Sequence, residues 1–127
     1  MMAMDGNSAP YLLYTHARAC SLLRKAAAEG SIPNGTPIVL EHSFERELAV
    51  SLLRYPEAFS AALRNAAPNT LAEQVYRMSE LFNRFYYELP VLNGGDSRQS
   101  RLELVDGARR VIAHGLQTLG LHPLERM

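Results

Sequence analysis

The sequence has little that would suit a secreted or membrane-bound protein. Cys20 is the only cysteine among the 127 residues, so no intrachain disulfide can form and a reducing compartment is expected. No apolar run approaches the roughly 20 residues that cross a bilayer. We therefore expect a cytoplasmic protein with no membrane partner.

The sequence also lacks an excess of charge of either sign. Its 13 basic residues are matched by 13 acidic residues, so the formal net charge is zero. Most freestanding nucleic-acid-binding domains are visibly basic. Any contact with RNA must therefore depend on local patches and on stacking, weak affinity is expected, and no DNA partner is predicted.

Patterns that would support catalysis or metal binding are scarce. A Gly-rich phosphate loop is missing, and such loops are the usual sign of nucleotide binding. His16 and Cys20 are four residues apart and could form a thiolate–imidazole pair or half of a zinc site. Two ligands are too few for stable zinc, and no C-x-x-C or H-E-x-x-H motif accompanies them. We favour a surface histidine beside a partly buried cysteine, with no catalytic residue, metal or cofactor in this chain.

Strand patterns are almost absent, and helical patterns cover most of the chain. The one β-branched stretch, residues 38–40, lies in a segment rich in Gly and Pro that we interpret as a loop. Pro56 is expected to divide one helical region into two, because the residue before a proline disfavours the α conformation. The fold class predicted is all-α, a compact bundle of about five helices over residues 10–29, 43–55, 56–67, 69–89 and 98–119.

Apolar spacing predicts which faces of these helices are buried. The clearest seam, at alternating spacings of four and three, should be the core face of the fourth helix. Leu53 and Leu63 are also expected to point inward. We expect one domain over residues 1–127, with an N-terminal arm at 1–9, partly of non-native origin, and a tail at 120–127 that follows a left-handed Gly120. The seam consists of Leu71, Val75, Met78, Phe82, Phe85 and Leu89.

One face of the first helix combines aromatic and basic side chains. Tyr11, Tyr14 and Arg18 are spaced i, i+3, i+7, and Ser21 and Lys25 continue the same face. Unstacked RNA bases are read on aromatic faces and guanidinium planes, so this face could bind RNA. Periodicity alone favours another interpretation, in which the tyrosines line the edge of the core with their hydroxyls at the surface. Lys25 alone would be a solvated helix end.

Three segments resemble one known family when they are taken in order. Residues 6–18 read GNSAPYLLYTHAR, which resembles the family word G-N-T-A-P-Y-x-x-Y-A-x-x-R with Ser8, Leu13 and Thr15 as departures. Residues 82–86, FNRFY, are followed by PVL at 90–92, and residues 101–127 end in PLERM. Together these segments resemble the C-terminal anticodon-binding domain of arginyl-tRNA synthetases.

That resemblance implies a helical bundle of the DALR type that grips the anticodon arm of arginine tRNA. It also implies a catalytic domain elsewhere in the same synthetase, with ATP and Mg as that domain's cofactors, because words of the H-I-G-H and K-M-S-K-S type are absent here. The positions implied as anticodon contacts are Tyr11, Tyr14, Arg18, Tyr86 and Met127. Lys25, Arg109 and Arg110 are candidates for phosphate contacts, although Arg110 can instead pair with Asp106.

Two other classes of function remain open at this point. A synthetase-derived helical module that binds protein and not RNA would fit the zero net charge. A small independent enzyme using His16 and Cys20 is the remoter alternative. A basic, aromatic-lined patch would favour RNA, whereas a broad exposed apolar patch would favour a protein partner.

Overall fold

The computed structural model describes residues 8–127, and its helices confirm the all-α prediction. No strand occurs within that range. No helix there is both long and apolar enough to cross a membrane. The elements are α1 (Ser8–Ala28), α2 (Ser43–Asn65), α3 (Pro68–Glu88), the short 3₁₀ helix η1 (Gly95–Ser97) and α4 (Arg98–Thr118).

The prediction of five helices is wrong, because α2 continues through Pro56. A proline inside a helix cannot donate a backbone hydrogen bond and commonly breaks the helix. Here α2 packs against α3 and α4. Tyr55, beside the proline, is buried with 6% of its surface exposed, and its hydroxyl lies 2.6 Å from His114 Nδ1 on α4. Tertiary contact therefore outweighs the local preference.

The continuous α2 helix also explains two errors in predicted burial. Leu48, Tyr55 and Ala62 are seven residues apart and form the buried stripe of α2. Leu53 and Leu63 lie off that stripe, with 80% and 64% of their surfaces exposed. Had the chain broken at Pro56, the second half could have turned Leu63 inward independently of the first.

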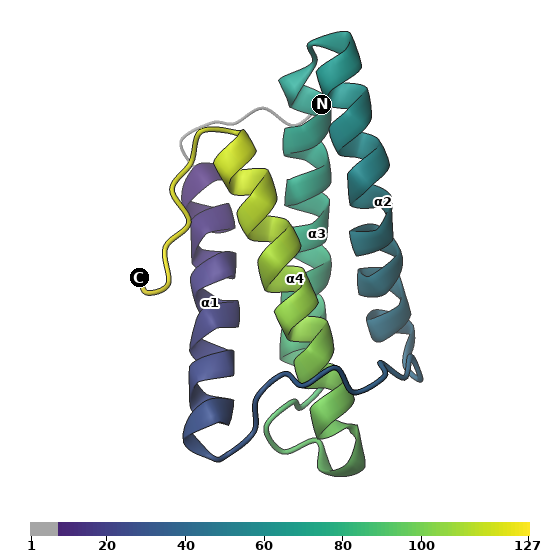
Figure 1. The fold of residues 1–127 in the computed structure, drawn as a ribbon, viewed down its shortest axis with the longest axis vertical. Coiled ribbons are helices and arrows are strands. Elements are labelled where there is room, and N and C mark those ends of the chain that lie inside the picture. The colour runs from purple at the N-terminus through teal and green to yellow at the C-terminus, as the bar shows by residue number, and fades with distance from the viewer. Residues whose placement is uncertain (1–7) are drawn as a thin grey trace.

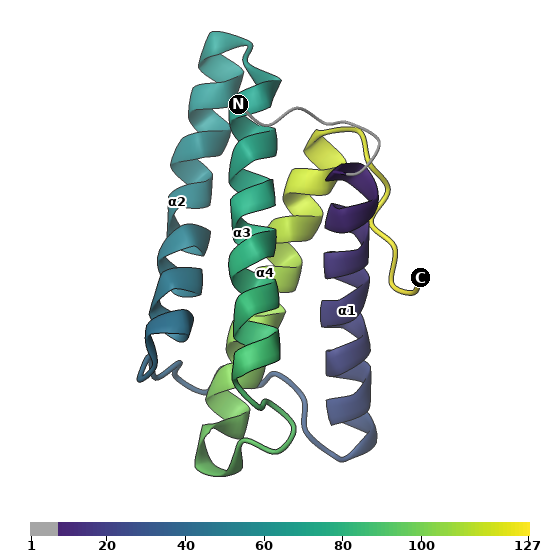
Figure 2. The ribbon, with the colours of Figure 1, turned by 180° about the vertical axis from the view of Figure 1, so that it is seen from behind.

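Helices α3 and α4 form the centre of the bundle, and α1 and α2 flank them on opposite sides (Figures 1 and 2). Both central helices contact both flanking helices, but α1 does not contact α2. The segment between α1 and α2 therefore crosses one end of the bundle (Figure 1). Because α1 does not contact α2, the face of α1 beside α3 can contribute to a surface site.

The predicted seam of α3 is confirmed, since all six of its members are buried. Its N-terminal part joins Leu12, Ile112 and Leu116 in one apolar cluster, and its C-terminal part joins residues of α1 and α4 in another. The predicted end of α4 is also confirmed. Gly120 has a φ of 82°, and Leu121 N–H donates to the Leu116 carbonyl at 2.8 Å.

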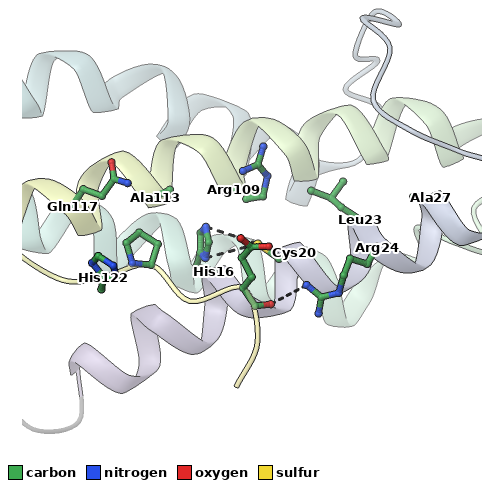
Figure 3. Close-up of a pocket in the computed structure, with 11 residues that line it drawn as sticks. His16, Cys20, Leu23, Arg24, Ala27, Arg109, Ala113, Gln117 and His122 are labelled. Carbon is green, nitrogen blue, oxygen red and sulfur yellow. Dashed lines mark hydrogen bonds between the residues drawn. The ribbon is translucent and has the colours of Figure 1, made fainter.

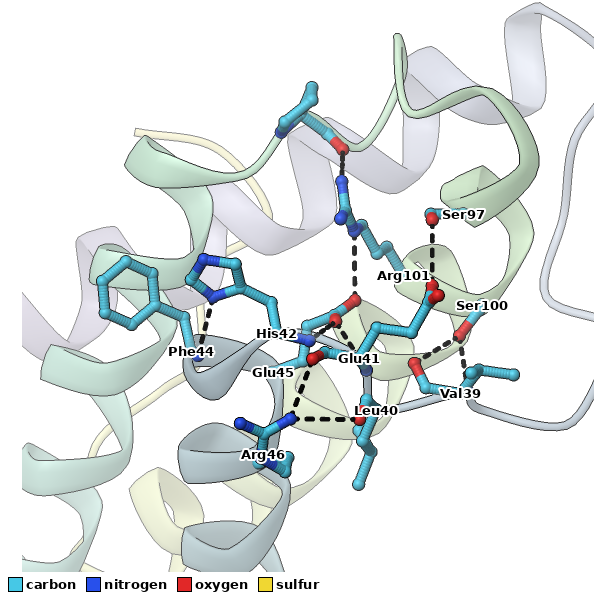
Figure 4. A network of polar contacts seen from close by, with 11 residues as sticks. Val39, Leu40, Glu41, His42, Phe44, Glu45, Arg46, Ser97, Ser100 and Arg101 are labelled. Carbon is cyan, nitrogen blue, oxygen red and sulfur yellow. Dashed lines mark hydrogen bonds and ion pairs between the residues drawn. The ribbon is translucent and has the colours of Figure 1, made fainter.

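A buried carboxylate fixes the start of α2. His42 is the N-cap, its side chain accepts from Phe44 N–H, and Glu45 completes a capping box. Glu45 is 1% exposed and accepts from His42 N–H at 2.7 Å and from Arg101 Nε at 3.0 Å. Arg101 in turn donates to the Pro90 carbonyl, so one network joins α2, α4 and the segment after α3 (Figure 4).

We expect Glu45→Ala to lower the free energy of unfolding by about 3–5 kcal/mol, because it leaves Arg101 as an unpaired, largely buried charge. Glu47→Ala is the matched control. Glu47 pairs with Arg84 at 3.7 Å where both side chains are more than 40% exposed, and such pairs contribute about 0–1 kcal/mol. Urea denaturation of the two variants measures both values, and equal losses would contradict this account.

Candidate functional site

A groove of about 330 Å³ runs between α1, α3 and the C-terminal segment. Five residues singled out from the sequence meet in it, although they are up to 113 positions apart in the chain. They are Tyr14, Arg18, Lys25, Tyr86 and Met127. The other lining residues are Ala17, Ser21, Leu22, Arg24, Leu92 and Arg126.

The guanidinium of Arg18 lies among three tyrosine rings. Its central carbon is 4.6 Å from the ring centroids of Tyr14 and Tyr86 and 4.7 Å from that of Tyr87. Nη2 donates to the Tyr14 hydroxyl at 2.6 Å and to the Tyr87 hydroxyl at 2.9 Å. Burial alone would lower the pKa of Arg18, but these two hydrogen bonds hold it above its ordinary value. The side chain is therefore a fixed, permanently charged plane.

A buried amide on α3 holds the other edge of that plane. Arg18 Nη1 donates to Asn83 Oδ1 at 2.8 Å. Asn83 Nδ2 donates to the hydroxyls of Tyr11 and Thr15, each at 3.0 Å. Tyr11 thus points into the α1–α3 interface and does not line the groove, and its ring lies 5.2 Å from that of Tyr76. Burial raises the pKa of Tyr11, so its hydroxyl stays protonated.

The groove is positively charged although the whole chain is neutral. Its lining includes Arg18, Arg24, Lys25 and Arg126 and no acidic side chain. Tyr14 is 46% exposed, so much of its ring faces solvent. The site combines an accessible aromatic surface with several cations, an arrangement that can stack a planar base and bind the phosphates beside it.

Two of the candidate phosphate contacts, Arg109 and Arg110, lie outside the groove. Arg109 Nη2 and Arg110 Nε contact the two carboxylate oxygens of Asp106 at 3.0 and 3.1 Å. The pairing foreseen for Arg110 is present, and Arg109 shares the same partner. Asp106 therefore compensates part of their combined charge within α4.

His16 and Cys20 line a second cavity, of about 550 Å³, between α1, α4 and the C-terminal segment (Figure 3). The prediction of a surface histidine is wrong: His16 is 3% exposed, because the C-terminal segment covers it. Cys20 Sγ lies 3.8 Å from His16 Nδ1, and burial raises the pKa of the thiol, which opposes a reactive thiolate. No group of three metal-ligating side chains occurs among residues 8–127.

Asn83, Arg24 and Arg126 belong to the site but were not predicted from the sequence, and Tyr87 was predicted only as a less certain neighbour of Tyr86. Asn83 lies within the FNRFY segment, between core positions. A polar side chain at the edge of a buried seam needs a hydrogen-bond partner, and this was the feature that could have identified it. Tyr87 follows Tyr86 directly, and its hydroxyl reaches Arg18 only because α3 packs beside α1. Arg24 and Arg126 gave no signal, since an isolated arginine is ordinarily a solvated side chain.

Comparison with known proteins identifies the family. Residues 12–127 match the model of the DALR anticodon binding domain. The chain is 40% identical over its whole length to an arginine–tRNA ligase of Picosynechococcus and 35% identical to one of Klebsiella pneumoniae. It spans 22% of the length of each of these relatives.

Solved structures give the same result. The arginyl-tRNA synthetase of Thermus thermophilus superposes with a TM-score of 0.83 at 34% identity, over 98% of this chain and 22% of that one. The arginyl-tRNA synthetase of Plasmodium falciparum gives a TM-score of 0.79 at 29% identity, over 92% of this chain and 21% of that one. The fold, the groove and these matches lead to one assignment: the chain belongs to the DALR anticodon-binding domain family.

Proposed function

We propose that the chain is the part of an arginyl-tRNA synthetase that binds the anticodon arm of arginine tRNA. It would support ATP-dependent arginylation, which a catalytic domain outside these 127 residues would perform in the cytoplasm with ATP and Mg. The names of the relatives support this proposal, and so does the fraction of their length, 22%, that the chain spans. The rest of such a protein is long enough to hold a catalytic domain.

The observation that carries the proposal is the groove with Arg18 fixed among tyrosines. An unstacked anticodon base can stack on the exposed side of Tyr14 or Tyr87, since these rings are 46% and 70% exposed. Arg18 supports both rings from within the groove through its hydrogen bonds to their hydroxyls. Because the rings are held before RNA arrives, little side-chain entropy is lost on binding.

The edges of the groove supply the phosphate contacts. Lys25 and Arg126 line it and can face the RNA backbone. Arg109 and Arg110 remain weaker candidates, because Asp106 neutralises part of their charge. Few phosphate contacts imply a shallow dependence of affinity on salt. We expect dissociation constants for the isolated chain of about 10⁻⁴–10⁻⁶ M, with a preference for arginine tRNA.

A protein-interaction module without RNA binding is not favoured. Such a module has no need for a groove that gathers four cations and exposed aromatic rings. The small-enzyme alternative loses its basis as well, because the Cys20 thiol is buried and its pKa is raised.

The Tyr14 ring can be tested by comparing two substitutions. Tyr14→Ala should weaken binding to the anticodon stem-loop by about 1–3 kcal/mol, the contribution of one stacked base, while Tyr14→Phe keeps the ring and most of the affinity. Fluorescence titration measures both. Leu53→Ala, at an exposed position of α2, is the control and should change nothing. If Tyr14→Ala costs stability of about 3–5 kcal/mol and leaves RNA affinity of the folded fraction intact, Tyr14 is a core residue and not part of the site.

Arg18→Lys tests whether the site needs a plane or only a charge. Lysine keeps the charge but cannot donate to Asn83, Tyr14 and Tyr87 together. We expect affinity for the stem-loop to fall at least about tenfold, since hydrogen bonds to charged groups contribute about 1.5–3 kcal/mol. Lys25→Arg is the matched control at the edge and should bind as the unaltered chain does. Equal affinities for both variants would show that charge alone matters.

The chain itself should neither bind ATP specifically nor charge arginine onto tRNA, because its sequence contains no phosphate-binding loop. Aminoacylation assays with radiolabelled arginine, on protein free of host synthetase, measure this. A full-length synthetase carried through the same purification is the positive control. Arginylation that co-purifies with the 127-residue chain and follows its concentration would contradict the prediction.

A further inference from the structure

The last residues of the chain turn back along α1 after Gly120. Both ribbon views show this C-terminal segment beside α1 (Figures 1 and 2). Residues 121–127 form no helix or strand, so no backbone ladder holds them there. Beyond the backbone hydrogen bond of Leu121 to Leu116, two side chains of α1 contact the segment.

The first contact is a hydrogen bond between His16 Nδ1 and the Leu124 carbonyl, with a length of 2.7 Å. A carbonyl oxygen only accepts, so Nδ1 carries the proton. His16 is buried, and Cys20 Sγ lies against the ring at 3.8 Å from Nδ1 and 3.9 Å from Nε2. Burial raises the pKa of the Cys20 thiol, so a neutral side chain packs against the His16 ring.

The second contact lies two turns further along α1. Arg24 Nη1 donates to the Glu125 carbonyl at 3.0 Å (Figure 3). Arg24 lines both cavities, the one beneath the tail and the groove beside it. The two residues that follow Glu125, Arg126 and Met127, both line the groove. The two contacts are therefore placed where the tail passes from one cavity to the other.

We propose that His16 and Arg24 are positioning residues, which hold the tail against α1 so that Arg126 and Met127 complete the groove. This rests on the proposed function, because the groove is the proposed RNA site. Both residues contact carbonyls of the tail, and neither has to touch an RNA base for this role. Each acts by fixing one carbonyl of a segment that has no regular structure of its own.

The first arm of the test follows the tail without RNA. We expect His16→Ala and Arg24→Ala each to increase the rate at which a carboxypeptidase releases Met127 by about 2- to 12-fold, the effect of one ordinary hydrogen bond. His16→Asn should restore a slow rate, because its amide places a donor close to the position of Nδ1. Gln117→Ala is the control, since Gln117 lines the same cavity from α4. Circular dichroism identifies any variant that fails to fold. If His16→Ala fails because His16 is buried, Arg24→Ala still tests the proposal, because Arg24 is not in the core.

The second arm measures affinity for the anticodon stem-loop. His16→Ala, Arg24→Ala and Met127→Ala should weaken binding by similar factors, and the His16→Ala/Met127→Ala double variant should be no weaker than the worse single variant. Unchanged Met127 release in both alanine variants would overturn the proposal, as would faster release with unchanged affinity. If the unaltered chain binds no stem-loop, the proposed function fails, whereas the release rates still judge the positioning of the tail.

Discussion

The hydrogen bonds of Asn83 connect the core of this protein to its surface site. Asn83 is 8% exposed, between two phenylalanines of the α3 seam, and an unsatisfied amide there would be costly. It finds its partners on α1: the hydroxyls of Tyr11 and Thr15 and the guanidinium of Arg18. The requirement to satisfy one buried amide therefore fixes how α1 is placed against α3. It also fixes the cation around which the groove is built.

The arginines outside and inside the groove differ in their partners. Outside the groove several arginines have acidic partners, as in Arg98 with Glu29 at 3.0 Å and Arg101 with Glu45 at 3.0 Å. Inside it Arg18 contacts phenols and Arg24 a backbone carbonyl, neither of which cancels a positive charge. A chain with zero net charge can thus present a cationic surface, because compensation is concentrated elsewhere.

The sequence predicted what depends on periodicity and missed what depends on contacts between distant segments. The α3 seam and the cap at Gly120 were predictable, because spacing and a left-handed glycine are local properties. The continuation of α2 through Pro56 was not, because the packing of α2, including Tyr55, against α3 and α4 decides it. Four positions that the resemblance implied, Tyr14, Arg18, Tyr86 and Met127, line one groove. Tyr11 does not line it. The resemblance gave no account of Asn83 or of the burial of His16, which depend on contacts across 65 and 108 positions of the chain.

The absence of contact between α1 and α2 has a consequence for the order in which the structure can assemble. Helices α2 and α3 are neighbours in sequence and in space, so their hairpin closes a short loop and can form early. Helix α1 has no such local partner and must wait for α3, α4 and the tail, at a higher entropic cost of closure. A partly folded chain would then contain the α2–α3 hairpin without the groove. Formation of the groove thus reports completion of the whole fold.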